Sequence, residues 1–337
     1  MSGVQNIPVS EQDEGMRLDR WFRQYFPQIR HGMLEKFLRK GQVRLDGGRV
    51  KANARLTPGQ MVRVPPLPIE GEPRESRPPV SNSSRAEDRQ FLQKLVIFED
   101  EALLVLNKPY GLAVQGGTKT RRHIDGMLNS WSNGDAHGDA RPRLVHRLDR
   151  DTSGVLVLAK SRKVATRLGE FFQKHQIEKT YWALTAGVPQ PKEGTIRLPI
   201  AKRMVNIADN EGIERVVPAT GEDAKQAITD FQTLDMAAEE IGFLALRPRT
   251  GRTHQLRVHC AALGLPIVGD GKYGGEKAKI DGLSAKMHLV CRQMSFRHPL
   301  TQKPVSFTAP VEGHFRQSLK FFGFDAEQST IWPEGLE

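Results

Sequence analysis

One carboxylate between two arginines is the first feature of the sequence that suggests chemistry. Asp149 lies between Arg147 and Arg150 in a polar segment, residues 143–154, and an apolar run follows at residues 155–159. An arginine paired with Asp149 would keep it ionised, because an opposite charge favours the charged form. An ionised, positioned carboxylate can act as a nucleophile or a base. The alternative is a turn or cap residue that hydrogen-bonds the neighbouring backbone.

A second polar segment, Thr250-Gly-Arg-Thr-His-Gln-Leu-Arg257, leads into a predicted helix at residues 255–263. It follows a strand-like apolar run at residues 243–246 and turns at Gly251. The helix dipole disfavours basic residues at a helix start, so Arg252 and its neighbours favour an anion or a carboxylate as partner. An ordinary basic loop that begins a helix is the alternative.

A third segment places Asn107 and Lys108 at the end of an apolar run, residues 103–106, directly before Pro109 and Gly111. A turn with glycine can approach a phosphate backbone closely. Most such turns are structural, and that alternative stays open here.

The charge is strongly positive and unevenly distributed. Fifty Lys and Arg residues against 39 Asp and Glu give a net charge of +11. Residues 15–65 hold twelve basic and three acidic residues, so this short module alone carries +9. A concentration of charge of this kind is typical of a surface that binds a polyanion, although a merely solubilising surface would look the same.

The chain divides into two domains. Residues 15–65 are predicted to form two helices, around residues 18–26 and 34–40, and a small sheet from residues 43–45 and 61–64. Residues 66–88 are rich in Pro, Ser, Glu and Arg and are expected to be a linker. Residues 89–324 alternate strand-like runs with turns, and helices are expected at 163–172 and 255–263, which indicates an α+β domain. The acidic tail, residues 325–337, is expected to be disordered.

Other sequence features narrow the class of protein. Cys260 and Cys291 have no CxxC spacing, and the histidines show no zinc-site spacing, so neither a metal nor a disulfide is expected. The longest apolar runs have the length of a strand, which is too short to cross a bilayer. The first fifteen residues are polar and acidic, unlike a signal peptide. We therefore expect a cytoplasmic protein without membrane contact.

Together these segments resemble the large-subunit ribosomal RNA pseudouridine synthases. Three motifs match in order: Asn107-Lys-Pro-Tyr-Gly-Leu112, His146-Arg-Leu-Asp-Arg-Asp-Thr-Ser-Gly154 and Thr250-Gly-Arg-Thr-His-Gln-Leu-Arg257. The shorter Lys179-Thr-Tyr181 matches too. The resemblance covers residues 95–315. Within the family, the motif sequences are most similar to those of the C-type members.

The resemblance implies a catalytic domain built on a mixed, mainly antiparallel sheet, and a role for each matching residue. Asp149 would attack the ribose C1′ or the uracil ring, so that the uracil is released, turns and rejoins through carbon. Arg257 would pair with Asp149, with Arg252 as the alternative. Tyr181 would pack against the target base and take part in proton transfer, and Leu289 would wall the pocket. The remaining substrate contacts would come from Asn107, Lys108, Arg147, Arg252 and His254. No cofactor is implied.

Residues 15–65 resemble the S4 RNA-binding domain, on Arg17-Leu-Asp19 and Gly41-Gln-Val-Arg-Leu-Asp-Gly47. The basic residues expected to contact RNA in this S4-like domain are Arg17, Arg20, Arg30, Lys36, Arg39, Lys40 and Arg44. The sequence therefore predicts an isomerase that acts on large-subunit ribosomal RNA as a monomer. A synthase directed at tRNA, and an inactive RNA-binding or ribosome-assembly protein, are the alternatives.

Overall fold

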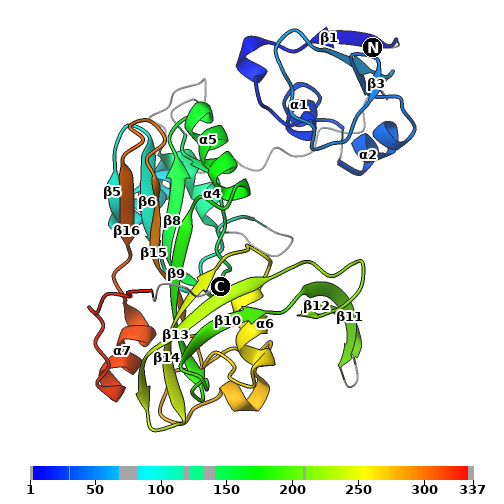
Figure 1. Cartoon of the computed structure of the whole chain (residues 1–337). Coiled ribbons are helices and arrows are strands. Elements are labelled where there is room, and N and C mark those ends of the chain that lie inside the picture. The colour runs from blue at the N-terminus through cyan, green and yellow to red at the C-terminus, as the bar shows by residue number, and fades with distance from the viewer. Residues whose placement is uncertain are drawn as a thin grey trace. The chain divides into compact units, whose positions relative to one another are not determined.

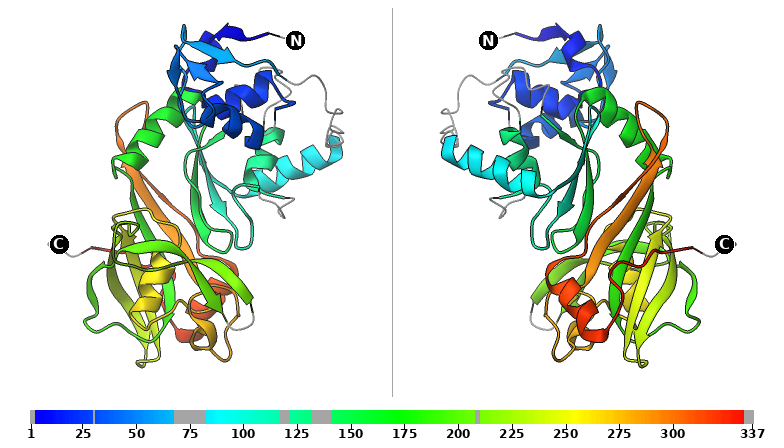
Figure 2. Two further views of the ribbon diagram at one scale, coloured as in Figure 1. Left: turned by 90° about the vertical axis from the view of Figure 1, so that its right-hand side faces the viewer. Right: turned by 90° about the vertical axis from the view of Figure 1, so that its left-hand side faces the viewer.

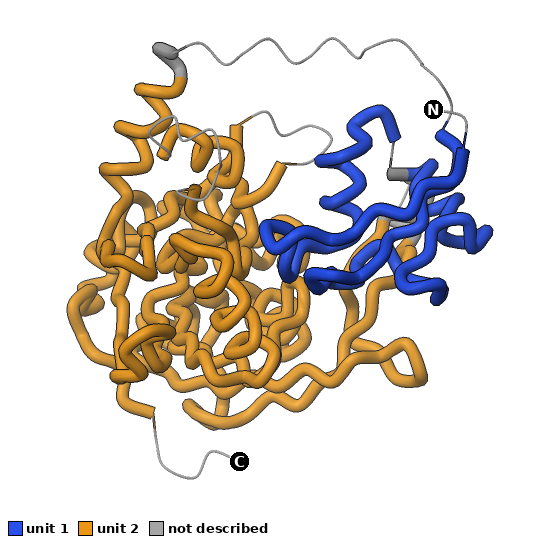
Figure 3. The backbone as a smooth tube through the Cα atoms, turned by 90° about the horizontal axis from the view of Figure 1, so that it is seen from above, with its two compact units in different colours: residues 1–81 blue, residues 82–337 orange. Residues whose placement is uncertain are grey.

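The computed structural model describes residues 3–29, 31–67, 82–116, 122–131, 141–207 and 210–332. The chain divides into two compact units, residues 1–81 and 82–337, which Figure 3 distinguishes by colour. Each unit has its own hydrophobic core, so each can be described by itself. No helix in the described ranges is both long and apolar enough to cross a membrane.

Unit 1 packs two helices on a small sheet. Helix α1 (Leu18–Tyr25) buries Leu18, Trp21 and Phe22, which recur at three- and four-residue steps and so share one face. Helix α2 (His31–Arg39) follows. The sheet has the order β1 (Gln5–Pro8), β4 (Met61–Val64), β2 (Arg44–Leu45) and β3 (Gly48–Arg49). Strand β1 lies before residue 15, where the domain was expected to begin. Its partner β4 is distant in the sequence, so a local pattern does not reveal the pairing.

Unit 2 is built on one long mixed sheet (Figure 1). Its order is β10 (Glu193–Arg197), β13 (Ile228–Ala237), β14 (Ile241–Pro248), β9 (Glu178–Ala186), β15 (Leu289–Arg297), β8 (Ser153–Ala159), β6 (Leu103–Lys108) and β5 (Val96–Glu99). Two further strands pair at its side, β7 (Arg143–Leu144) with β8 and β16 (Pro304–Thr308) with β15. All these pairings are antiparallel except β15 with β8, so the mixed, mainly antiparallel sheet is confirmed. A separate ribbon, β11 (Ile200–Ile207) with β12 (Asn210–Pro218), extends from it.

Helices cover both faces of this sheet. Helix α6 (Gln255–Ala262) packs Leu256 and Cys260 against one face, and α7 (Gly313–Phe322) packs Phe315 and Leu319 against the opposite face. Helix α5 (Arg162–Gln173) begins at Ser161, whose hydroxyl accepts from the Val164 backbone N–H. The remaining helical segments are η1 (Glu11–Asp13), α3 (Asn82–Lys94), α4 (Ile124–Met127), η2 (Leu128–Ser130) and η3 (Gly275–Ala278).

The structure adds two findings at the borders of the expected domains. Helix α3 begins inside the segment expected to be a linker. Its residue Leu92 is buried in the core of unit 2, so the helix belongs to that unit. Residues 68–81 of that segment lie outside the described residues. The expectation of a disordered tail is wrong for residues 325–332, where Ala326 and Trp332 pack against the core on the α7 side of the sheet. A segment that is acidic on average can therefore still be ordered by the few apolar residues that it packs against the core.

Candidate active site

The Asp149 loop is fixed by backbone contacts on both sides. Gly154 has a φ of +106° and lies against the Cys291 backbone, where a Cβ would collide. On the other side, the Lys108 ammonium donates to the carbonyls of Pro109, Leu112 and Arg150. The loop that carries Asp149 is therefore anchored at residue 150 and at the start of β8.

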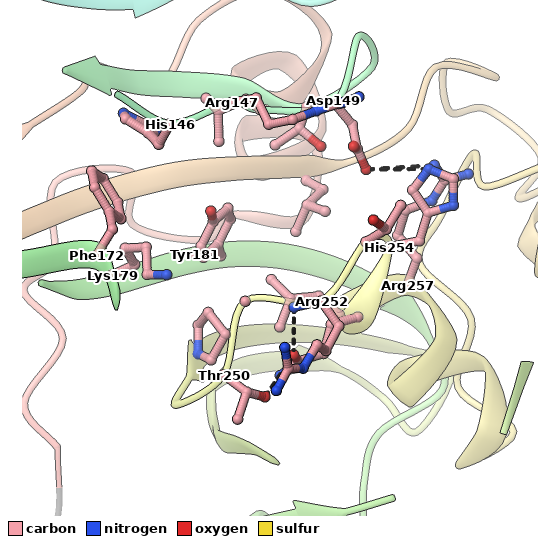
Figure 4. Close-up of a pocket in the computed structure, with 18 of the residues that line it drawn as sticks. His146, Arg147, Asp149, Phe172, Lys179, Tyr181, Thr250, Arg252, His254 and Arg257 are labelled. Carbon is pink, nitrogen blue, oxygen red and sulfur yellow. Dashed lines mark hydrogen bonds and ion pairs between the residues drawn. The ribbon is translucent and has the colours of Figure 1, made fainter. Parts of the chain in front are cut away.

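The Asp149 carboxylate faces two cationic or ionisable side chains from the start of α6 (Figure 4). Its Oδ2 is 3.6 Å from Nε2 of His254 and 3.9 Å from Nη1 of Arg257. His254 reaches this position because it adopts a left-handed conformation, φ 54°, just before the helix. Burial lowers the pKa of His254, and its Nδ1 lies 2.7 Å from the Tyr273 hydroxyl. The carboxylate is a quarter exposed, so it remains accessible from the cavity.

Arg257 is held by a second carboxylate that the sequence did not suggest. Its Nε and Nη2 each donate to Asp270 at 2.7 Å, a bidentate pair with Asp270 fully buried. The remaining nitrogen, Nη1, faces Asp149. These contacts favour Arg257 over Arg252 as the partner of Asp149, since Arg252 donates instead to the Gln226 carbonyl. Asp270 lies in the glycine-rich segment 269–273, which could have drawn attention to it. Nothing in the sequence indicates that Arg257 is its partner.

Tyr181 and Leu289 come from neighbouring strands of the sheet. On β9, Tyr181 lies directly opposite Cys291 of β15. Burial raises the pKa of Tyr181 well above its usual value, so the phenol is neutral near pH 7. Leu289, two residues before Cys291, points to the same face. Both predicted pocket residues, Tyr181 and Leu289, line the cavity.

The cavity has a volume of about 500 Å³, within the range of small-molecule sites. The lining residues His146, Phe172 and Lys179 lie at the end of the cavity away from Asp149 (Figure 4). His146 stacks on Phe172 and accepts a 2.9 Å hydrogen bond from the Val157 backbone. Burial lowers the pKa of His146 to about 3 and also lowers the pKa of Lys179. Sequence reasoning assigned no role to Phe172 or His146, because their approach depends on helix α5.

The other predicted substrate contacts divide into two groups. Arg147, Arg252 and His254 line the cavity, and Arg147 is exposed without a hydrogen-bond or ion-pair partner among the described residues. Asn107 and Lys108 are not among the described lining residues. The amide of Asn107 donates to the Pro310 carbonyl, and Lys108 is fully buried. The predicted contact of Lys108 with substrate is therefore wrong for this structure, since its ammonium binds three backbone carbonyls instead.

Lys108 gives a prediction about stability and pH. Burial lowers its pKa from 10.5 to about 7 in the folded chain. Between these values the unfolded chain binds more protons, so stability rises with pH, by up to about 1.4 kcal/mol per pH unit. We expect urea unfolding of the wild type to show this rise from pH 7 to 9 relative to Lys108→Met. The exposed Lys94→Met serves as control, and parallel pH curves for wild type and Lys108→Met would contradict the assignment.

The predicted basic residues of unit 1 fall into engaged and available groups. Arg17 forms a 2.5 Å ion pair with Asp19, and Arg44 donates to the carbonyls of Gly41 and Gly47. Arg20, Lys36, Arg39 and Lys40 are exposed, and Arg17 is exposed too despite its ion pair. Arg30 lies outside the described residues.

Comparison with known proteins agrees with this geometry. Residues 102–262 match the family model described as RNA pseudouridylate synthase. The chain is 35% identical to ribosomal large subunit pseudouridine synthase C of Vibrio cholerae over 326 residues, covering 94% of this chain and 96% of that protein. It is 36% identical to RNA pseudouridine synthase 4, mitochondrial, of Arabidopsis thaliana, over 77% of this chain and 60% of that protein. The solved structure of human RNA pseudouridylate synthase domain containing 4 superposes with a TM-score of 0.57 at 28% identity, covering 71% of this chain and 96% of that one. The chain belongs to the RNA pseudouridylate synthase family.

Proposed function

We propose that this protein converts uridines of large-subunit ribosomal RNA into pseudouridine, with Asp149 as the nucleophile. One observation carries the proposal: among the described lining residues of the cavity, Asp149 is the only carboxylate. The same cavity is lined by four Lys and Arg side chains, those of Arg147, Lys179, Arg252 and Arg257. Such a site favours an anionic substrate over a neutral one. It also differs from hydrolytic glycosidase sites, which use paired carboxylates.

The reaction needs no co-reactant, because uridine and pseudouridine contain the same atoms. The bond from C1′ to N1 breaks, a bond from C1′ to C5 forms, the proton leaves C5 and N1 gains one. Asp149 supplies the nucleophile that opens the glycosidic bond, and Arg257 orients it while being held by Asp270. The neutral Tyr181 packs against the uracil, and Leu289 limits the space in which the released base turns.

The target base must leave its stack to reach this cavity. A uracil paired or stacked in folded RNA does not expose its glycosidic bond to a side chain, so the nucleotide has to be extruded. The exposed guanidinium of Arg147, which has no partner among the described residues, is suited to contact an adjacent phosphate, and so is that of Arg252. His254, which lies beside Asp149, is suited to a hydrogen bond with the ribose or the base.

The choice of ribosomal RNA rests on the relatives and on unit 1. The V. cholerae relative, which this chain matches over nearly its full length, is named for the large ribosomal subunit. An S4-like unit with exposed cations adds affinity for structured RNA without reading its sequence. We also propose that the protein works as a monomer, since Asp149, Tyr181 and Arg257 already meet within a single chain, and that it acts in the cytoplasm on its rRNA substrate.

The test is pseudouridine formation on protein-free large-subunit rRNA and, in parallel, on bulk tRNA. Modified uridines are located by carbodiimide-dependent stops of reverse transcription. We expect new stops in the rRNA alone. Stops in tRNA alone would replace the substrate but keep the reaction, whereas stops in neither RNA, nor in assembly intermediates of the large subunit, would overturn the proposal.

Unit 1 gives a prediction about salt dependence. If Arg20, Lys36, Arg39 and Lys40 each meet a phosphate, replacing all four with alanine lowers the slope of log K against log salt by about 3. We expect weaker rRNA binding at low salt and an unchanged melting temperature, because the four side chains are exposed. The measurement is filter binding from 50 to 200 mM KCl. Glu35→Ala on the same helix is the control, and an unchanged slope would exclude these contacts.

A further inference from the structure

The last described residues of the chain lie across the back of the cavity wall. In Figure 2 this segment, at the red end of the colour scale, runs from α7 across the sheet. Residues 324–332 alternate between inward and outward positions, with Phe324, Ala326, Thr330 and Trp332 facing inward and Ile331 exposed at 77%. This alternation is that of an extended chain. We call residues 325–332 the strap.

The strap contacts strand β9 on both sides of Tyr181. Trp332 donates from Nε1 to the Thr180 hydroxyl at 3.3 Å, and Trp182 donates from Nε1 to the Thr330 hydroxyl at 3.0 Å. Side chains alternate along a strand. Tyr181 therefore points into the cavity while Thr180 and Trp182 point to the strap.

The strap also holds the strands beside β9. On β14, the Arg247 guanidinium lies 4.5 Å from the Trp332 ring centroid, and Asp230 fixes that arginine at 3.0 Å. On β15, Arg292 donates to the Ala326 carbonyl at 3.3 Å and lies 3.8 Å from the Glu327 carboxylate. Three adjacent strands that carry cavity residues on one face are thus bound by one segment on the other.

The contact with Arg292 falls on an irregularity of the sheet. The pairing of β15 with β9 shifts between Cys291 and Gln293, so that Cys291 faces Tyr181, Gln293 faces Thr180, and Arg292 is the extra residue. A bulge of this kind interrupts the ladder and re-aims side chains. The backbone ladder is therefore interrupted next to Cys291, which lies opposite Tyr181. The strap binds the sheet at this same place, through Arg292.

We propose that the strap positions Tyr181, by fixing β9 and the β15 bulge from behind the cavity. Thr330, Trp332 and Arg292 are then positioning residues, which act on the reaction through Tyr181 and do not touch the substrate. The effect on turnover rests on the proposed function of Tyr181, but the positioning itself does not. A strap that only covers apolar surface would add stability without affecting the tyrosine.

The experiment compares two variants of the full chain. The double variant Thr330→Val, Trp332→Leu removes both hydrogen bonds to β9, and Ile331→Ala changes the exposed residue between them. Each protein is labelled with 3-fluorotyrosine, which gives resonances from the four tyrosines of the chain, and Tyr181→Phe assigns the one from Tyr181. Turnover on rRNA, the KM for RNA and the melting temperature are measured alongside.

We expect the double variant to lose about tenfold in kcat with an unchanged KM, because small misplacements of a reacting group are costly. Its Tyr181 resonance should shift or broaden while those of Tyr25 and Tyr273 stay, and Ile331→Ala should match the wild type. An unchanged Tyr181 resonance in the double variant overturns the proposal, whatever happens to turnover. If the wild type itself modifies no RNA, the proposed function fails while the resonance still decides the positioning.

Discussion

Replacing Asp149 with Asn is expected to lower pseudouridine formation by at least about 10⁴-fold, since a missing nucleophile is not replaced by the rest of a site. The amide keeps the shape of the side chain but cannot attack carbon. RNA affinity should hold or rise slightly, because one negative charge leaves a cavity lined by four cations. The assay is single-turnover conversion with saturating enzyme, together with filter binding of the same rRNA.

Asp151→Asn is the matched control for this experiment. Asp151 lies in the same loop, two residues further on, but is not among the described lining residues of the cavity. We expect its turnover to stay within a few-fold of the wild type. Ordinary turnover by Asp149→Asn would show that another group attacks, and a loss of RNA binding would show that the carboxylate supports the fold of the loop.

Asp270→Ala is expected to have the second-largest effect, because it removes the bidentate partner of a buried arginine. Arg257 is only 9% exposed in its side chain and Asp270 is not exposed at all. Removing one member of a buried pair typically costs about 3–5 kcal/mol. Asp270 Oδ1 also accepts from the backbone of Lys272 and Tyr273, so the loop after it loosens. Urea unfolding should show the loss, and turnover should fall with it.

A second variant separates stability from catalysis at this pair. Replacing both members with apolar residues, Arg257→Met with Asp270→Leu, removes the uncompensated charge and should recover part of the stability. Turnover should remain low, because Asp149 has then lost the guanidinium that faces it at 3.9 Å. Recovery of turnover in the double variant would mean that Arg257 supports only the fold.

The sequence predicted those parts of the site that depend on local patterns. The helix at 163–172 and the runs that became β6, β8 and β14 follow from the apolar spacing, and the motifs locate Asp149, Tyr181 and Arg257. Asp270 could not be assigned, because an aspartate in a glycine-rich turn looks solvated until the fold buries it against Arg257. Lys108 was misjudged for a similar reason. A lysine at the end of a strand is usually exposed, and only long-range packing places three carbonyls around it.

The tail was wrongly predicted to be disordered, because its average composition combines an exposed acidic face with an inward face. Asp325 and Glu327 alternate with Ala326 and Gln328, so the acidic side chains hide the inward positions. Strand β1 was missed because four residues ending in Pro8 give little pattern by themselves. In both cases the missing information was the surface against which the segment packs.

The strand order has a consequence for synthesis of the protein. Strand β9 follows β8 along the chain, yet in the sheet β15 lies between them. The loop of Asp149 leads into β8, and Tyr181 belongs to β9. The two sides of the cavity are therefore joined only after residue 297 has been made. A growing chain cannot assemble this cavity before β15 has been made, so the modifying activity arises only after the ribosome has passed residue 297.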